Sequence, residues 1–247
     1  MAFHCTDPRL GVPMSIAYGA ATDYPSGYLE PQIGTIVGAY DPFYGYGEFI
    51  WAYGVTGLDA GEVASINPLT GAATLTVAAT RGAIIGVAMV TNTSSTTGMW
   101  YQIAGAALAK VAASFAANAP VYSTATAGTV DDAVVAGSGI TGAVSVSAID
   151  YSPGTKVAST TNGSDIITVS SLDGLVKGMS VTGTGIPALT TIAGIGFGGV
   201  FPPNASPMAA TIQLSAAATA TGNPTLTFTA TGSAVIGMNR ASMSGLG

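Results

Sequence analysis

The sequence predicts an all-β protein: a β-barrel or β-sandwich core domain plus a second small β domain, with an extended N-terminal arm. Short runs of β-branched and aromatic residues recur between Gly, Pro and Asn, which is the pattern of short strands joined by tight turns. Several runs alternate apolar and polar residues, so one face of each strand can be buried. The 247 residues suffice for one large or two small cores. In chain order, we expect an arm at 1–45, the barrel or sandwich at 46–157, the small domain at 158–231 and a tail at 232–247.

The arm differs from the rest of the chain in composition. Five of the 13 prolines and five of the 10 tyrosines lie in residues 1–45. Proline removes a backbone donor and favours extended or turn conformations. We therefore expect an extended segment with aromatic anchors, among them Tyr24 and Tyr28, that binds a neighbouring molecule. The alternative is a loop-rich start that covers the chain's own core.

The second segment shows the strand pattern most clearly. Its expected strands recur at roughly 8–12-residue spacing, which is typical of a barrel or sandwich. The Ala-rich stretch 106–117 has helix propensity, but Gly105 precedes it and strands flank it, so we favour strand for much of it. The expected strands are 48–53, 61–66, 73–77, 81–90, 98–103, 120–124 and 140–146.

The third segment, 158–231, repeats the pattern on a smaller scale. Clean alternation in several runs indicates one buried and one solvated face. A Gly/Pro-rich loop at 194–207 interrupts it, and the tail at 232–247 is expected to dock on the first domain or on a neighbour. The expected strands are 165–170, 179–182, 190–193, 211–215 and 225–229.

Ionised side chains are unusually scarce in this chain. Only 7% of residues are charged, against roughly 25% in an ordinary soluble domain. The 6 basic and 12 acidic residues cannot cover a monomer's surface, and large apolar surfaces usually mark interfaces. We therefore expect an obligate assembly. The basic residues are scattered, which argues against direct nucleic-acid binding.

The cysteine content and the N-terminal residues bear on the cellular compartment in which the chain is expected. Cys5 is the only cysteine, so an intrachain disulfide and a zinc site of several thiolates are both excluded. The first residues lack a basic region followed by an apolar run, so no signal peptide is expected. The longest apolar run, 104–117, contains Lys110 and is too short to span a bilayer. We expect synthesis in the host cytoplasm and no membrane partner.

An aromatic cluster marks the start of the second segment. Alternate residues of a strand point to opposite faces, so one set can fill the core while the other meets a partner. Burial in the core alone and burial combined with an interface both remain open. The candidate interface residues here are Phe43, Tyr44, Tyr46, Phe49, Trp51 and Tyr53.

Patterns that could carry chemistry are weak, and we expect no catalytic, metal or cofactor site. His4 and Cys5 are adjacent near a terminus, which rarely gives the shaped pocket that a thiolate–imidazole pair needs. The Gly194–Gly199 run has G-x-G-x-x-G spacing, but two prolines follow where a dinucleotide site needs a helix.

Carboxylates offer equally little. Asp131 and Asp132 are too few to hold a hard cation by themselves. Glu48, Asp59 and Glu62 could form an acid–base pair, but nothing in the sequence brings them together. The Asn-x-Ser sequences at Asn92, Asn162 and Asn204 are expected to be ordinary loops because no secretion signal is present.

The order and spacing of short motifs over 46–145 supply a resemblance. The motifs are Tyr46-Gly-Glu-Phe-Ile-Trp51, Ala60-Gly-Glu-Val63, Arg81-Gly-Ala-Ile-Ile-Gly-Val-Ala88, Met99-Trp-Tyr-Gln-Ile-Ala-Gly105, Pro120-Val-Tyr-Ser-Thr124 continuing to Asp131, and Ile140-Thr-Gly-Ala143. This stretch resembles tailed-phage capsid decoration (cement) proteins and related head proteins. The resemblance implies a compact β-barrel, often trimeric, on the outside of a capsid lattice, with the major capsid protein and its own copies as partners. It supplies no catalytic positions.

The small domain has a likeness of its own. Its runs at 161–171, 174–187, 190–192 and 212–221 resemble a small β module repeated in phage structural and bacterial surface proteins, apart from the long 194–207 insertion. The expected function is therefore non-enzymatic capsid decoration on the virion exterior. The alternatives are another virion component, such as a head fibre or tail component, or an adhesive module that binds host surface glycans through 158–231.

Overall fold

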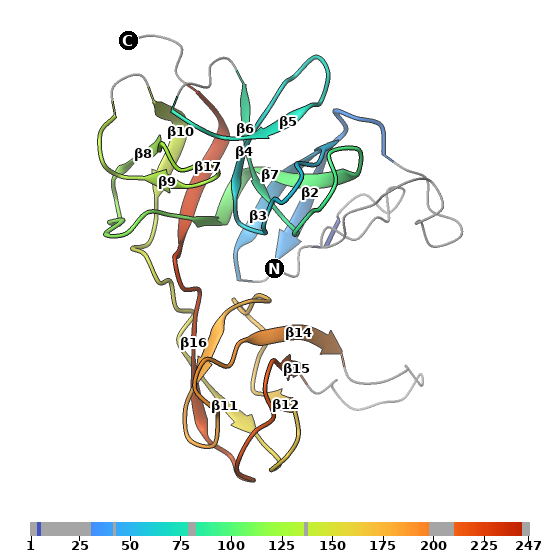
Figure 1. Ribbon diagram of the computed structural model, residues 1–247, viewed down its shortest axis with the longest axis vertical. Coiled ribbons are helices and arrows are strands. Elements are labelled where there is room, and N and C mark those ends of the chain that lie inside the picture. The colour runs from blue at the N-terminus through green and yellow to red at the C-terminus, as the bar shows by residue number, and fades with distance from the viewer. Residues whose placement is uncertain are drawn as a thin grey trace. The chain divides into compact units, whose positions relative to one another are not determined.

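The computed structural model describes residues 4–5, 31–41, 43–78, 83–135, 138–197 and 210–243. These residues form antiparallel strands and contain no helix, which confirms the predicted all-β class. Accordingly, they include no helix long and apolar enough to cross a membrane. The chain divides into two compact units: the barrel unit, residues 2–149 and 232–247, and the inserted unit, residues 150–231 (Figure 1).

The barrel unit contains an 11-stranded antiparallel sheet that curls into a nearly closed barrel (Figure 1). The main strand order is β1-β2-β3-β7-β6-β17-β10-β8-β9, with β4 paired to β5 and β6. The strands are β1 (His4–Cys5), β2 (Ile36–Asp41), β3 (Gly45–Tyr53), β4 (Val63–Ile66), β5 (Ala73–Leu75), β6 (Ile84–Ala88), β7 (Gly98–Lys110), β8 (Pro120–Ser123), β9 (Val130–Asp131), β10 (Gly139–Ser145) and β17 (Ser233–Met243).

The long strand β7 organises this sheet by changing partners along its length. Residues 98–104 pair with β3, whereas residues 104–110 pair with β17. Gly105 lies at the change with φ of +91°, and a Cβ there would come 2.4 Å from the Tyr46 carbonyl oxygen, so only glycine fits. The buried Gln102 amide donates to the carbonyls of Ala104 and Ala106, which satisfies backbone groups at this irregularity. The strand expected for much of the Ala-rich stretch is thus present through Lys110.

The structure draws the segment boundaries differently from the sequence-based expectation. Residues 232–247 were expected as a tail, yet β17 lies inside the sheet, between β7 and β10. Its inward side chains include Ala234, Ile236 and Met238, so the period-2 pattern contributes directly to the core. At the other end, the expected arm 1–45 includes β2, which belongs to the sheet. Apart from β1, the first 30 residues, with Tyr24 and Tyr28, lie outside the described residues.

The barrel core is apolar and tightly packed. Trp51 and Trp100 face each other across β3 and β7 with ring centroids 5.1 Å apart at 67°, an edge-to-face geometry that aromatic rings favour. Two further clusters fill the interior. One is centred on Val87, Phe115 and Ile236, and the other on Ile66, Met99 and Tyr101.

The inserted unit contains a six-stranded antiparallel sheet in the order β13-β16-β11-β12-β15-β14. The two ends of this order also meet, because Val181 N donates to Thr190 O at 2.8 Å and Ile192 N donates to Met179 O at 2.9 Å. The ring of strands is therefore closed by backbone hydrogen bonds. The strands are β11 (Thr155–Ser159), β12 (Ile166–Val169), β13 (Ser180–Thr182), β14 (Ile192–Phe197), β15 (Ala210–Leu214) and β16 (Thr225–Thr229).

The first and last residues of the inserted unit lie next to each other. Ala230 N donates to Tyr151 O at 2.8 Å, so the two ends of the unit are paired. In the barrel unit, the flanking strands β10 and β17 already pair directly, with Ser145 opposite Ile236. The unit is thus an insertion into a β-hairpin, beginning at 150 rather than at the expected 158. Paired ends of this kind are the usual arrangement in tolerated domain insertions.

Candidate functional site

The aromatic cluster expected at 43–53 divides between core and surface. Phe49 and Trp51 are fully buried and Tyr44 is nearly so, whereas Phe43, Tyr46 and Tyr53 are 41%, 57% and 40% exposed. Strand alternation alone does not explain the division. Tyr53 lies two residues after the buried Trp51, in the same phase of β3, and is exposed at the end of the strand. The described part of the cluster therefore contributes both to the core and to the exterior.

Three exposed aromatic side chains form what we call the aromatic ridge: Tyr40, Phe43 and Tyr46. Tyr40 lies directly opposite Tyr46 in the β2–β3 ladder, so both project from the same face. The Tyr46 ring lies over Gly38, where a Cβ would collide with it. At the turn, the buried Asp41 carboxylate accepts hydrogen bonds from the backbone N–H groups of Phe43 and Tyr44 at 2.8 and 2.9 Å. These two bonds hold the backbone amides of Phe43 and Tyr44 against the end of β2.

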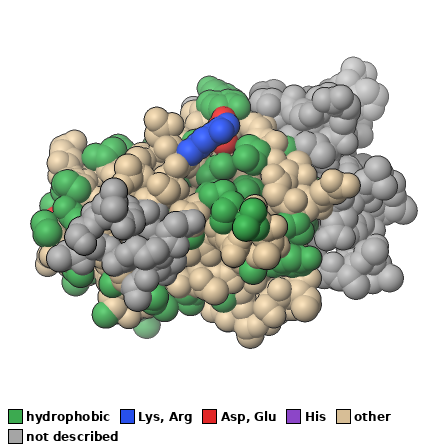
Figure 2. All heavy atoms as spheres, turned by 90° about the horizontal axis from the view of Figure 1, so that it is seen from above, with side chains coloured by type: hydrophobic (Ala, Val, Ile, Leu, Met, Phe, Trp, Pro, Cys, Tyr) green, Lys and Arg blue, Asp and Glu red, His purple; other side chains and the backbone are tan. Residues whose placement is uncertain are grey.

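A second exposed apolar surface lies on β10 and β17, and we call it the valine stripe: Val144, Val146 and Gly237. Val144 and Val146 are 48% and 53% exposed. Gly237 pairs with Val144 on one side and Ala106 of β7 on the other, and the methyl groups of Val146 and Val144 lie 3.3 and 3.5 Å from where its Cβ would be, so the two valines cover this position. On the face that Figure 2 presents, several patches of hydrophobic side chains lie between neutral ones, and one small spot of ionised groups is visible.

Glu48 and Arg240 form an ion pair across the barrel sheet. Arg240 Nε and Nη2 donate to the two carboxylate oxygens at 2.7 and 3.2 Å. The hydrogen bond from Arg240 lowers the pKa of Glu48 below its ordinary value, against a smaller opposing effect of burial. This two-point contact matches guanidinium to carboxylate, and it neutralises the one carboxylate that β3 carries.

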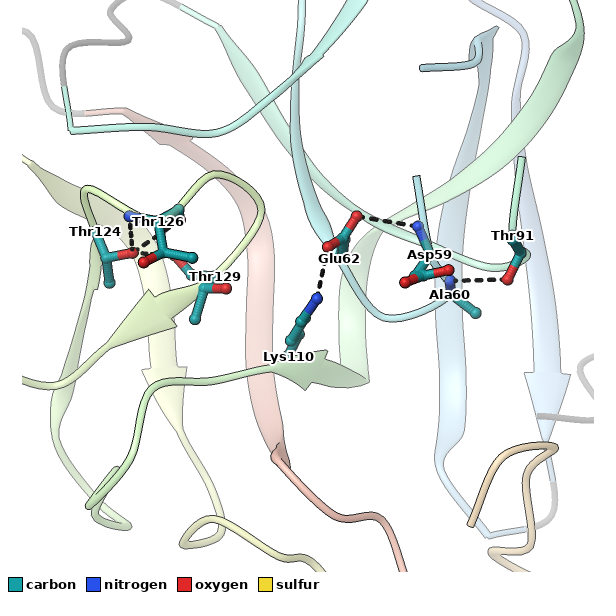
Figure 3. A network of polar contacts seen from close by, with 8 residues as sticks. All are labelled: Asp59, Ala60, Glu62, Thr91, Lys110, Thr124, Thr126 and Thr129. Atoms are coloured by element: carbon teal, nitrogen blue, oxygen red, sulfur yellow. Dashed lines mark hydrogen bonds and ion pairs between the residues drawn. The ribbon is translucent and has the colours of Figure 1, made fainter. Parts of the chain in front are cut away.

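Glu62 and Lys110 form the second ion pair, shown in Figure 3. Lys110 Nζ lies 2.7 Å from Glu62 Oε1, and the backbone N–H of Asp59 donates to Glu62 Oε2 at 3.0 Å (Figure 3). The Glu62 side chain is only 8% exposed. This contact ties the loop before β4 to the end of β7. Glu48 is thus paired with Arg240 and Glu62 with Lys110, so each of these two carboxylates has its own cationic partner.

The structure adds no further ligand or catalytic partner to the remaining sequence candidates among the described residues. Asp131 accepts a hydrogen bond from the backbone N–H of Asp132 at 2.8 Å, and the described residues contain no group of three or more His, Cys, Asp or Glu side chains suited to a metal ion. The G-x-G-x-x-G run begins inside strand β14, and its end lies outside the described residues. For His4 and Cys5 the structure describes only the backbone, which pairs with β2.

The inserted unit has a shallow pocket of about 230 Å³ on β12, β14 and β15. Its lining contains no ionisable group, so it offers neither a general acid nor a base. The absent side chain of Gly194 leaves part of the space open, because a Cβ there would meet only Gln213, at 3.6 Å or more. The lining residues are Ile166, Gly194, Ile195, Thr211, Ile212 and Gln213.

Sequence reasoning missed several of these surface residues. Val144 could have been recognised from alternation in the strand predicted at 140–146, whereas Tyr40 was assigned to the arm. Nothing in the sequence indicates that Gly194 faces a pocket, since this depends on which strands become neighbours. Comparison of the chain with models of known protein families, with curated proteins and with solved structures finds no match.

Proposed function

We propose that this chain is a non-enzymatic phage virion structural protein that binds the exterior of the assembled capsid as a decoration protein. One observation carries the proposal: a surface with very few charges presents exposed apolar side chains on the aromatic ridge and the valine stripe. The motif resemblance over 46–145 supplies the class of partner. The major capsid protein and further copies of the chain, as a homotrimer, are the proposed partners.

The aromatic ridge has the composition of a binding surface. Exposed large apolar side chains cost free energy in water, and aromatic residues are enriched where interface energy concentrates. Tyr40 and Tyr46 each present a broad ring and a hydroxyl group, which suits an interface that is apolar at its centre and wet at its rim. The hydrogen bond from the Phe43 backbone N–H to Asp41 restrains the backbone at Phe43, which reduces the entropy lost when a partner immobilises this residue.

The edge of the sheet offers a second mode of contact. β1 pairs with β2 through His4 opposite Tyr40 and Cys5 opposite Ala39, so the arm can add a strand to this edge. An unpaired edge would be available to any extended chain, and strand addition is a common recognition mode. We propose that arm contacts of this kind help to join neighbouring copies on the lattice.

The proposed mechanism is thermodynamic. A protein that binds the assembled lattice but not free capsid subunits stabilises the shell by mass action, by an amount that grows with its free concentration. No bond is made or broken, and the process requires no catalytic group, cofactor or nucleic acid. The bound chain would lie on the virion exterior after synthesis in the host cytoplasm.

The test uses expanded capsids of the phage that encodes the chain, prepared without it. The full-length chain is added, and we expect saturable binding and a higher capsid melting temperature. The variant with Tyr40→Asp and Tyr46→Asp should lose both effects. The matched control is Leu69→Asp, which alters a 94% exposed apolar side chain on the β4–β5 turn and should retain both.

Three other outcomes would overturn the proposal. A chain that stays a freely soluble monomer with no affinity for shells would refute it. Spontaneous growth into tubes or rods in the absence of capsids would indicate a tail component. Binding to cells or glycans without capsids would indicate the adhesive function for the inserted unit.

A further inference from the structure

Leu189 in the β13–β14 loop combines two unfavourable features. Its side chain is 97% exposed, the largest value among the described large hydrophobic residues. Its backbone has φ of 62°, in the left-handed region that glycine and asparagine tolerate and that costs free energy for other residues. Backbone strain of this kind tends to mark functional positions.

The surrounding loop holds Leu189 firmly in place. The buried Thr190 donates its hydroxyl to the Pro187 carbonyl at 2.8 Å, and its own carbonyl accepts the Val181 N–H at 2.8 Å. On the other side, the Gly185 carbonyl accepts the N–H of Thr219 at 2.8 Å. These bonds restrain the backbone from which Leu189 projects, which reduces the backbone entropy lost on binding.

The pocket at Gly194 lies on the same unit and has complementary properties. It is concave, lined largely by isoleucine side chains and free of ionisable groups, and its volume of about 230 Å³ can accept a leucine side chain. Because Leu189 is almost fully exposed, it does not occupy this pocket in its own chain. In the described part of the inserted unit, Leu189 is thus the most exposed apolar projection, and the Gly194 pocket is an apolar hollow.

We propose that Leu189 of one copy inserts into the Gly194 pocket of a second copy. A projection and a hollow at different places on one molecule produce a head-to-tail contact, in which each copy uses both features. The contact brings no charge to either side, so its strength should change little with salt concentration. This inference concerns the inserted unit and does not depend on capsid binding by the barrel unit.

The test uses two variants of the full-length chain that remove opposite halves of the contact. Leu189→Asn removes the projection and places a residue that tolerates the left-handed backbone. Gly194→Val fills the hollow, and its Cβ has ordinary contact distances to Gln213 in a strand that favours β-branched residues. Both variants should retain the wild-type strand content and melting behaviour. Leu69→Asn, at the other highly exposed leucine of the β4–β5 turn, is the matched control.

Sedimentation velocity over a range of concentrations provides the readout. The wild-type chain and the Leu69→Asn control should form species larger than the smallest oligomer as concentration rises. Each of the two contact variants alone should require at least roughly tenfold higher concentration, as expected from losing one buried apolar side chain. An equimolar mixture of the two variants should restore contacts between unlike copies, because one retains the pocket and the other retains the leucine. Association should therefore reappear on mixing but extend less far than in the wild type, where each copy uses both features.

The mixture makes the proposal falsifiable. If the wild-type chain shows no association beyond its smallest species, the proposal is overturned. It is also overturned if only one variant has an effect or if mixing restores nothing, because Leu189 would then bind a different surface. The affinity of a single copy of either variant for the capsid should equal that of the wild type. Loss of self-association with unchanged capsid binding can therefore be told apart from a failure of the proposed function.

Discussion

The two ion pairs of the barrel unit provide a matched test of how burial sets the value of a charge–charge contact. Both have an N–O distance of 2.7 Å. The Glu62 side chain is 8% exposed, whereas the Glu48 side chain is 23% exposed and its partner Arg240 is 62% exposed. Since solvent screens exposed pairs and removal of one partner from a buried pair leaves an unpaired charge, the Glu62–Lys110 pair should contribute far more to stability.

The perturbation is Lys110→Met, which keeps much of the side-chain volume and removes the ammonium group. It leaves the Glu62 carboxylate with the hydrogen bond from the Asp59 backbone N–H. Breaking a fully buried pair costs about 3–5 kcal/mol. Because Lys110 is 45% exposed, water can replace part of the lost contact, so we expect a loss of about 2 kcal/mol. For a unit of this size, that lowers the melting temperature by about 4–8 °C.

A double-mutant cycle isolates the interaction. Glu62→Gln, Lys110→Met and the double variant are compared with the wild type by urea unfolding. The comparison is valid when the slope of unfolding free energy against urea concentration is the same for all four proteins. The double variant should be more stable than the sum of the single losses predicts, with a coupling of about 1–2 kcal/mol. The parallel cycle with Glu48→Gln and Arg240→Met should give a clearly smaller coupling that declines further in high salt. Equal couplings in the two cycles would refute the reasoning from burial.

Three further predictions follow from the core, from a buried tyrosine and from the insertion. Gly98→Ala should destabilise the barrel unit by about 1–3 kcal/mol in urea unfolding, because its Cβ would lie 2.5 Å from the buried Trp51 ring; an unchanged midpoint would contradict this packing. Burial raises the pKa of Tyr101, whose hydroxyl donates to the Tyr53 carbonyl. The neutral Tyr101 side chain should therefore contribute its full stability below about pH 10, and this contribution should be lost as the pH rises further. Tyr101→Phe should flatten the resulting alkaline decline in melting temperature. Replacing 150–231 by a short Gly/Ser linker should leave a cooperatively folding barrel unit, measured by circular dichroism and thermal unfolding, because its flanking strands already pair; a molten product would show that the insertion supports the barrel.

The sequence by itself determined the class of the fold. The density of β-branched residues, the period-2 alternation and the frequent glycines are local features, and strand formation follows from them directly. The same local reasoning assigned strand to much of the Ala-rich stretch and located most of the strands in the inserted unit. Composition also established that the chain carries too few charges for an ordinary monomer surface.

Only the tertiary structure decided which segments share a core and which side chains remain outside. β17 reads as a tail in the sequence, yet it pairs with β7 across more than 120 residues of intervening chain, a relation that no local pattern encodes. Whether Glu62 meets Lys110 or Glu48, whether Leu189 is exposed, and whether Gly194 lines a pocket all depend on strand register and loop geometry. These are long-range properties, because backbone hydrogen bonding and apolar burial select one pairing from many with the same local preferences.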